Sequence, residues 1–165
     1  MPYPNAPRFT PTITGTVYYV STSGNDNNPG TLASPFATIG KGISMVSPGG
    51  AVYIRGGTYN VGPGSLYIGK SGTSLTSMIN LIAYTGETPI IEGLYSTSLG
   101  MYDALVNLAG NYIYLEGIEV RNSNGMGVYM GGHHNIVHGG KSHDHKTNGI
   151  LIAGDYGIVE HSQVY

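Results

Sequence analysis

From Leu105 to its last residue, the sequence repeats at one fixed spacing. This spacing is the separation along the chain between Val106 and Val128. A shift by this spacing aligns three apolar columns and one glycine column: Val106/Val128/Ile150, Leu108/Met130/Ile152, Leu115/Val137/Val159 and Gly110/Gly132/Gly154. It also aligns Glu116, His138 and Glu160. Five columns that share one period without an insertion indicate a repeat protein, in which each unit stacks on the one before it.

The composition of the repeat favours a parallel β-helix. Leucine-rich repeats have a similar period, but their Leu/Asn consensus is missing here. Short runs of β-branched residues alternate with Gly and Asn, which suit strands and corners. In a β-helix each coil lays its strands about 4.8 Å from those of the previous coil, so inward residues form apolar columns. We therefore expect an all-β, single-stranded parallel β-helix with about 22 residues per coil.

One short helix is predicted before the coils. Ser34 and Pro35 resemble a helix N-cap followed by Pro at the first helical position. Four apolar residues after them share one helical face, and a Pro-Gly-Gly sequence ends the pattern, which predicts a helix over residues 35–47. The apolar residues are Phe36, Ile39, Ile43 and Val46. Since the first coil of a solenoid exposes its interior and its strand edges, this helix is expected to cap it.

These patterns divide the chain into three parts. Residues 1–16 form an extended, Pro-rich leader, and residues 17–50 form an N-terminal strand and the capping helix. Residues 51–165 form the coils, which we expect to be truncated at their C-terminal end. The last coil would then expose strand edges, and a second copy of the chain is a candidate to cover them end to end.

The composition restricts the classes of partner. Only 10% of the 165 residues are charged, compared with about 25% in typical soluble domains, and the net charge is −2. No basic run is present, so we expect no nucleic-acid partner. No apolar stretch approaches the roughly 18 residues of a membrane span, so we expect no membrane partner. The chain has no Cys, which excludes disulfides and thiol chemistry.

Three stretches carry a resemblance to a known family. They are "YYVSTSGNDNNPGTLASPFATIGKGISMVSPGGAVYIRGGTY" (residues 18–59), "YIYLEGIEVRNSNGMGVYM" (residues 112–130) and "SHDHKTNGILI" (residues 142–152). The first resembles the opening of secreted right-handed β-helix proteins, among them the pectate lyases of polysaccharide lyase family 9, and the others are similar to their early coils. The resemblance implies a right-handed helix, secretion and an acidic polysaccharide as substrate.

The resemblance also implies where the chemistry of such a lyase lies. These enzymes place an Asp-rich calcium site and a Lys base on later coils, in runs such as Asp-Gly-Phe and Asp-Asp-Gly. Neither run occurs in this sequence. No catalytic residue is therefore carried over, no cofactor is expected in this chain, and calcium is expected only with downstream coils.

The densest polar cluster is "HGGKSHDHKTNG", residues 138–149. Elimination requires a base to remove a proton and cations to stabilise the charge that develops. The cluster offers four candidate catalytic residues: Lys141, His143, Asp144 and Lys146. A solvated corner between coils explains the cluster more simply, and a transition-metal site at its histidines is a further alternative. No metal ligands are assigned.

Candidate substrate-binding residues are Tyr129, Tyr156, Arg121 and His138. An aromatic face can stack on a sugar ring, although Tyr is also favoured in strands for packing alone. Tyr102 and Tyr112 belong to the same aromatic set. His138 aligns with Glu116 and Glu160, where it forms either a charge ladder or an acid–base group.

We interpret the sequence as the N-terminal portion of a secreted, pectate lyase-like protein, inactive as this fragment. Two alternatives remain at this point. One is a solenoid without catalytic activity that binds glycans, and the other is a structural solenoid that assembles by end-to-end stacking.

Overall fold

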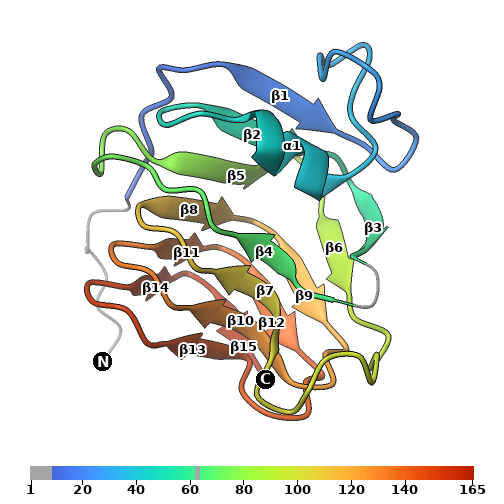
Figure 1. Ribbon diagram of the computed structural model, residues 1–165, viewed down its shortest axis with the longest axis vertical. Coiled ribbons are helices and arrows are strands. Elements are labelled where there is room, and N and C mark those ends of the chain that lie inside the picture. The colour runs from blue at the N-terminus through green and yellow to red at the C-terminus, as the bar shows by residue number, and fades with distance from the viewer. Residues whose placement is uncertain (1–8, 62–63) are drawn as a thin grey trace.

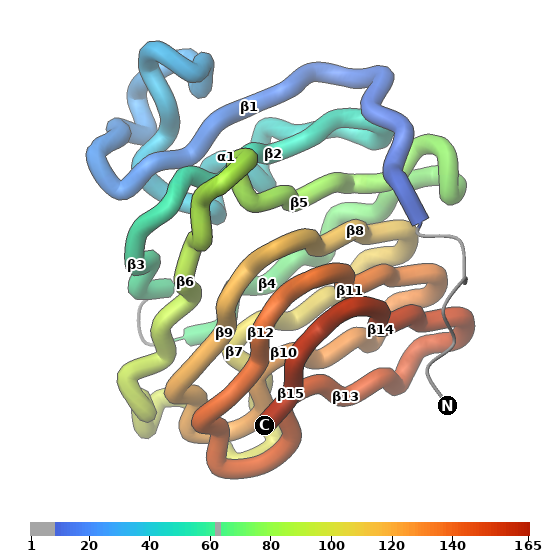
Figure 2. Tube along the Cα trace, turned by 180° about the vertical axis from the view of Figure 1, so that it is seen from behind, coloured from blue at the N-terminus to red at the C-terminus, as the bar shows by residue number. Residues whose placement is uncertain are grey.

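The computed structural model describes residues 9–61 and 64–165, which wind into a stack of coils with three parallel sheets (Figures 1 and 2). Residues 1–8, half of the predicted leader, lie outside the described residues. Residues 9–16 contain no strand or helix, and Thr14 and Gly15 both donate backbone hydrogen bonds to the carbonyl of Gly49. The predicted all-β parallel β-helix is confirmed.

Each sheet collects one strand per coil. Sheet A has the order β1 (Val17–Val20), β2 (Ala51–Ile54), β5 (Ile79–Ala83), β8 (Ile113–Glu116), β11 (Ile136–His138) and β14 (Ile158–Glu160). Sheet B has the order β3 (Gly57–Asn60), β6 (Pro89–Glu92), β9 (Glu119–Arg121), β12 (Lys141–His143) and β15 (Gln163–Val164). Sheet C has the order β4 (Leu66–Ile68), β7 (Ala104–Leu108), β10 (Met126–Met130) and β13 (Ile150–Ile152). All neighbouring strands are parallel.

The predicted columns coincide with the observed strand register. Val128 pairs with Val106 on one side and Ile150 on the other, and Val137 pairs in the same way with Leu115 and Val159. The regular spacing seen in the sequence holds only for these later coils. Earlier pairs are further apart in sequence, for example Ala51 with Asn80 and Leu66 with Val106. The corners between strands absorb the extra residues, so the register of the sheets is kept.

The glycine column marks the corner between sheet C and sheet A. A Cβ on Gly132 would collide with the carbonyl oxygen of Gly110, and one on Gly154 with that of Gly132. Beside them the buried Asn135 accepts a hydrogen bond from the backbone N–H of Ile113 at 2.9 Å and donates one to the Gly110 carbonyl at 2.9 Å. The corner is therefore tight enough to require glycine and still satisfies its backbone groups.

The helix is shorter than predicted, because it begins later. Helix α1 spans Ile39–Met45, and its N-cap is Thr38, whose hydroxyl accepts from the N–H of Lys41 at 3.1 Å. The prediction of Ser34 as N-cap was wrong. The backbone of Phe36 forms a parallel bridge with Val20 of β1, which holds residue 36 in an extended conformation and prevents the helix from starting there.

Helix α1 lies across the N-terminal end of the coils, beside β1 and β2 (Figure 1). Its buried residues are Ile39, Gly42 and Ile43, and Phe36 and Val46 on either side of it are also buried. The predicted apolar face therefore covers the interior of the first coil, as expected for a cap. No helix within residues 9–61 and 64–165 has both the length and the apolar character that crossing a membrane requires.

Candidate carbohydrate-binding groove and polar clusters

The outward face of sheet C carries a row of aromatic and amide side chains. The strand register aligns Tyr67 of β4 with Asn107 of β7, Asn107 with Tyr129 of β10, and Tyr129 with Leu151 of β13. Their neighbours Val106, Leu108, Val128 and Met130 are buried in the core. Since successive side chains of a strand point to opposite faces, the aligned row faces outward.

A hollow of about 470 Å³ lies over this row. Tyr129 and Asn107 line it from the sheet, Tyr102 lines it from the loop before β7, and Asn148 from the loop before β13. Of the aromatic residues predicted from the sequence, the fold thus brings Tyr129 and Tyr102 together in one hollow. A second hollow, of about 660 Å³, lies beside it, and Ser65 lines both hollows. The two hollows are together called the groove.

Asn107 lines this groove and carries a buried hydrogen-bond acceptor. Its side-chain oxygen is buried and has no hydrogen-bond partner among the described residues. Buried polar atoms nearly always have a partner, so this oxygen retains an unused capacity to accept a hydrogen bond. Asp103 is the single charged residue among the described residues that line the two hollows. The groove is therefore suited to sugar rings and hydroxyl groups, and its lining provides no cation for a carboxylate.

Sheet B carries a charged network on its outward face. Arg121 of β9 donates to Glu92 of β6 at 2.8 Å and to Glu119 of β9 at 3.1 Å. Burial raises the pKa of Glu92, but the hydrogen bonds from Arg121, Leu94 and Asn122 outweigh it, and the net pKa lies below the ordinary value. Arg121, a predicted substrate-binding residue, therefore has its guanidinium held by two carboxylates of its own chain.

Two of the four candidate catalytic residues contact each other at the edge of this network. His143 of β12 lies 2.7 Å from Asp144 and 3.4 Å from Glu119, and its ring stacks on Tyr165 with a centroid distance of 5.0 Å. Lys141 is exposed on the same strand, two residues before His143, whereas Lys146 is exposed in the loop that follows. The strand register aligns His143 with Arg121, and the next residues, Asn122 and Asp144, both have a left-handed φ, of +58° and +56°.

His145, the remaining histidine of the cluster, lies partly inside the solenoid. Its Nδ1 accepts a hydrogen bond from the N–H of Ser123 at 3.2 Å, and its Nε2 lies 3.0 Å from the hydroxyl of Ser142. That hydroxyl donates to the carbonyl of Gly149 at 2.7 Å, so Nε2 is the protonated nitrogen of a neutral ring. Burial, followed by the charge of His143, lowers the pKa of His145 to about 4. Both ring nitrogens of His145 are hydrogen-bonded within the fold and the ring is neutral, which indicates a structural role.

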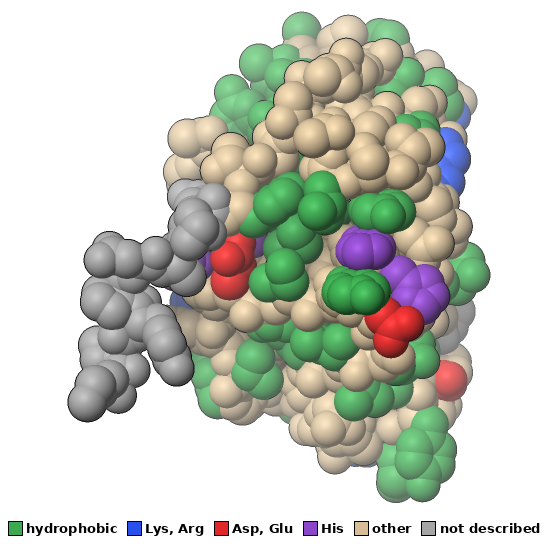
Figure 3. All heavy atoms as spheres, turned by 90° about the vertical axis from the view of Figure 1, so that its left-hand side faces the viewer, with side chains coloured by type: hydrophobic (Ala, Val, Ile, Leu, Met, Phe, Trp, Pro, Cys, Tyr) green, Lys and Arg blue, Asp and Glu red, His purple; other side chains and the backbone are tan. Residues whose placement is uncertain are grey.

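The other two predicted substrate-binding residues lie away from the groove. His138 is buried on the outward side of sheet A and donates to Glu160 at 3.0 Å. Tyr156 lies at the corner between sheets C and A, where its ring stacks on His134, which stacks on Tyr112; both centroid distances are 4.7 Å. Figure 3 shows this edge of the solenoid, where histidine and acidic side chains gather beside hydrophobic ones. His134 covers one face of the Tyr156 ring, and Tyr156 remains 75% exposed at this corner, away from the groove.

The coil architecture and the open groove on sheet C define a right-handed β-helix of the pectate lyase-like kind. The sequence profile of the family described as "Pel9A-like, right handed beta helix region" matches residues 18–165. The chain belongs to this family, as its resemblance in sequence predicted.

Three proteins are similar to this chain in sequence or structure. It is 29% identical over 135 residues to pectate lyase L of Paenibacillus polymyxa and 26% identical over 161 residues to pectate lyase L of Dickeya dadantii. These alignments cover 81% and 90% of this chain, but 29% and 37% of the relatives. The crystal structure of pectate lyase Pel9A superposes with a TM-score of 0.76 at 27% identity, over 90% of this chain and 39% of Pel9A. The chain thus spans about a third of the length of these proteins.

Proposed function

We propose that this chain forms the N-terminal coils of a secreted protein that cleaves acidic polysaccharide by β-elimination, and that these coils alone bind polysaccharide without cleaving it. The supporting observation is the groove on sheet C, which Tyr102, Tyr129 and Asn107 line, in a chain whose relatives are pectate lyases. The sparse charge and the uncharged polar surface support secretion.

The chemistry of elimination explains why further coils are required. A base must remove the proton beside the uronate carboxylate, the C–O bond to the leaving sugar then breaks, and an unsaturated product remains. Cations must stabilise the carboxylate while charge develops on it. The described lining of the groove contains neither a Lys nor a His, so we assign the base and the calcium to coils downstream of residue 165.

Titration with oligogalacturonate, followed by NMR or calorimetry, tests the groove. Tyr129→Ala and Tyr102→Ala should each weaken binding several-fold, because each removes an aromatic face on which a sugar ring can stack. Tyr156→Ala is the matched control and should leave the affinity unchanged. Loss of binding in Tyr156→Ala alone would move the site to the aromatic stack at the corner.

An ultraviolet assay for unsaturated products tests the absence of cleavage. The 165-residue chain should release none from polygalacturonate, with or without calcium. Product formation would contradict the proposal. If that activity then disappeared in His143→Ala or Lys141→Ala, the active site would lie on the outward face of sheet B.

The exposed apolar residues of the last coil favour a second function, end-to-end self-association. Ile152, Val159 and Val164 are exposed at the strand edges of β13, β14 and β15. Covering this surface with a second copy would bury apolar area at about 25 cal/mol per Å². Light scattering should show association that is insensitive to salt and reduced by Ile152→Glu. A monomer at all concentrations would exclude this function.

A further inference from the structure

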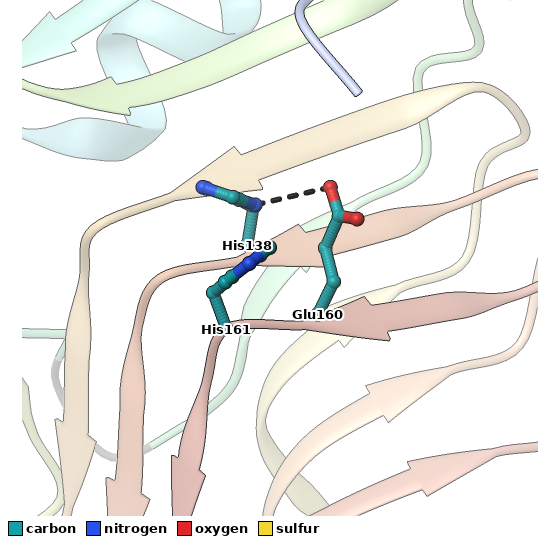
Figure 4. A group of neighbouring side chains, drawn as sticks. All are labelled: His138, Glu160 and His161. Carbon is teal, nitrogen blue, oxygen red and sulfur yellow. Dashed lines mark hydrogen bonds and ion pairs between the residues drawn. The ribbon is translucent and has the colours of Figure 1, made fainter. Parts of the chain in front are cut away.

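Three side chains with metal-binding atoms meet on the outward side of sheet A: His138, Glu160 and His161 (Figure 4). One ligand atom of each lies within 4.8 Å of the others. Nδ1 of His138 is 3.0 Å from Oε1 of Glu160, and the two imidazole rings have a centroid distance of 5.1 Å. In a tetrahedral zinc site with bonds of about 2.0–2.1 Å, ligand atoms lie about 3.3 Å apart, so small side-chain rotations complete such a site.

The backbone at His161 provides a second, independent observation. His161 has a φ of +52°, and a shift by one coil and then by two aligns it with Gly139 and Gly117, which have φ of +63° and +72°. The two earlier coils thus use glycine at this left-handed corner, where a side chain is disfavoured. The last coil thus has a histidine in place of the corner glycine, and its imidazole lies beside that of His138.

The surroundings of the cluster favour a dication. Glu116 of β8 pairs in register with His138 on one side, and Glu160 of β14 pairs with it on the other. The carboxylate of Glu160 lies beside the two imidazoles and supplies a negative charge that favours a cation. Glu160 is further oriented by the N–H of Phe9, at 3.3 Å, and an outer contact of this kind holds a metal ligand in place.

We propose that His138, Glu160 and His161 bind a divalent transition-metal ion of the zinc type. Two imidazoles and one carboxylate form a ligand set that is typical of zinc, with the fourth position open to water. Calcium and magnesium prefer sites made of oxygen ligands, so this site is not expected to take them. It goes beyond the proposed polysaccharide function, since it lies on sheet A and the groove lies on sheet C. No metal ligands were predicted from the sequence.

The test uses the whole chain, freed of metal by a chelator. Calorimetry with ZnCl₂ should give one site per chain, and CaCl₂ should give no heat at the same concentrations. Co²⁺ should produce the intense visible absorption of a tetrahedral site. His161→Ala and Glu160→Gln should each weaken Zn²⁺ binding by about 10-fold or more. Zn²⁺ should also raise the melting temperature of the natural chain and raise it less in both variants.

His133→Ala is the matched control, because His133 is an exposed histidine that lies outside the cluster and is 3.4 Å from Asp155. It should bind Zn²⁺ as the natural chain does. Circular dichroism of each variant establishes that it is folded. Absence of stoichiometric Zn²⁺ binding would overturn the proposal. So would binding that survives both His161→Ala and Glu160→Gln, or that disappears in His133→Ala, because the metal would then be held elsewhere.

Discussion

Inward-facing apolar residues are buried at the N-terminal end of the solenoid but exposed at its C-terminal end. At the N-terminal end, α1 and Phe36 cover the interior, and Val20 and Val46 are 0% exposed. At the C-terminal end, Ile152 is 44% exposed, although it continues the column of Leu108 and Met130, which are both 0% exposed. Burial of an inward residue thus depends on the coil or cap stacked upon it as much as on its own position.

This difference explains how the fold is stabilised. Each coil contacts mainly its neighbours, so a residue contributes in proportion to what lies on both sides of it. The helix closes one side permanently, whereas the last coil leaves its edges available to further coils or to another chain. Substitutions at the two ends should therefore differ even where the residue types are the same.

The largest effect is expected for Phe36→Ala at the capped end. Phe36 is 1% exposed, its ring lies 5.6 Å from that of Tyr18, and its truncation should lower the free energy of unfolding by about 3–5 kcal/mol. Urea denaturation measures this. Leu32→Ala, at an exposed residue of the same segment, is the control and should change little. Equal effects of the two substitutions would mean that the segment does not cap the core.

A matched pair of valines compares the middle of the solenoid with its open end. Val137 and Val159 pair in register within one column, yet they are 4% and 36% exposed. Val137→Ala should cost about 1–3 kcal/mol, and Val159→Ala clearly less. Denaturation at several protein concentrations sharpens the comparison, because association would bury Val159 and increase its cost. Similar losses for both variants in dilute protein would contradict the open end.

Asp26 fixes the entry to the capping helix. Its carboxylate accepts hydrogen bonds from the N–H groups of Ala37 and Thr38, both at 2.9 Å, and from the Thr38 hydroxyl at 2.8 Å. Asp26→Ala should cost about 1 kcal/mol, the typical net contribution of such contacts. Thermal unfolding measures the loss, with Asn27→Ala at an exposed neighbour as control. If Asp26→Ala were as stable as the control, the helix would be positioned by its apolar face alone.

The sequence predicted the columns because a strict period is recorded in the chain itself. It misplaced the start of the helix because the extended backbone of Phe36 depends on hydrogen bonds to β1, which no local pattern records. Tyr102 and Tyr129 were recognisable by type, but their meeting in one hollow depends on the loop before β7. The pairing of Arg121 with Glu92 joins β9 to β6, a strand that lies before the regular repeat begins. His161 was missed, although its alignment with two corner glycines was a signal that could have found it.

The smallest expected effect is a dependence of the free energy of unfolding on pH, and it differs between the two ends of the solenoid. An unfolded chain protonates His145 below pH 6.5, whereas the folded chain does so only below about 4, so the free energy of unfolding should fall as the pH decreases through this window. Asp26 contributes at a lower pH. Burial raises the pKa of Asp26, but the hydrogen bonds from Thr38 and Ala37 outweigh this effect and the net pKa is lowered. The stabilisation by Asp26 is therefore lost only as the pH falls below 3.8. Because the His145 ring is only half buried, water retains part of its hydration and the change should be modest.

His145→Asn isolates the contribution of the open end. An Asn side chain offers an oxygen near the position of Nδ1, which can accept from the N–H of Ser123, and it cannot be protonated. The variant should therefore lose part of the stability of the natural chain near neutral pH. Its free energy of unfolding should depend less on pH between 6.5 and 4. Urea denaturation across this range compares the two slopes. The same slope in both proteins would show that another group titrates there, and that the partly interior position of His145 does not control the acid response of the last coils.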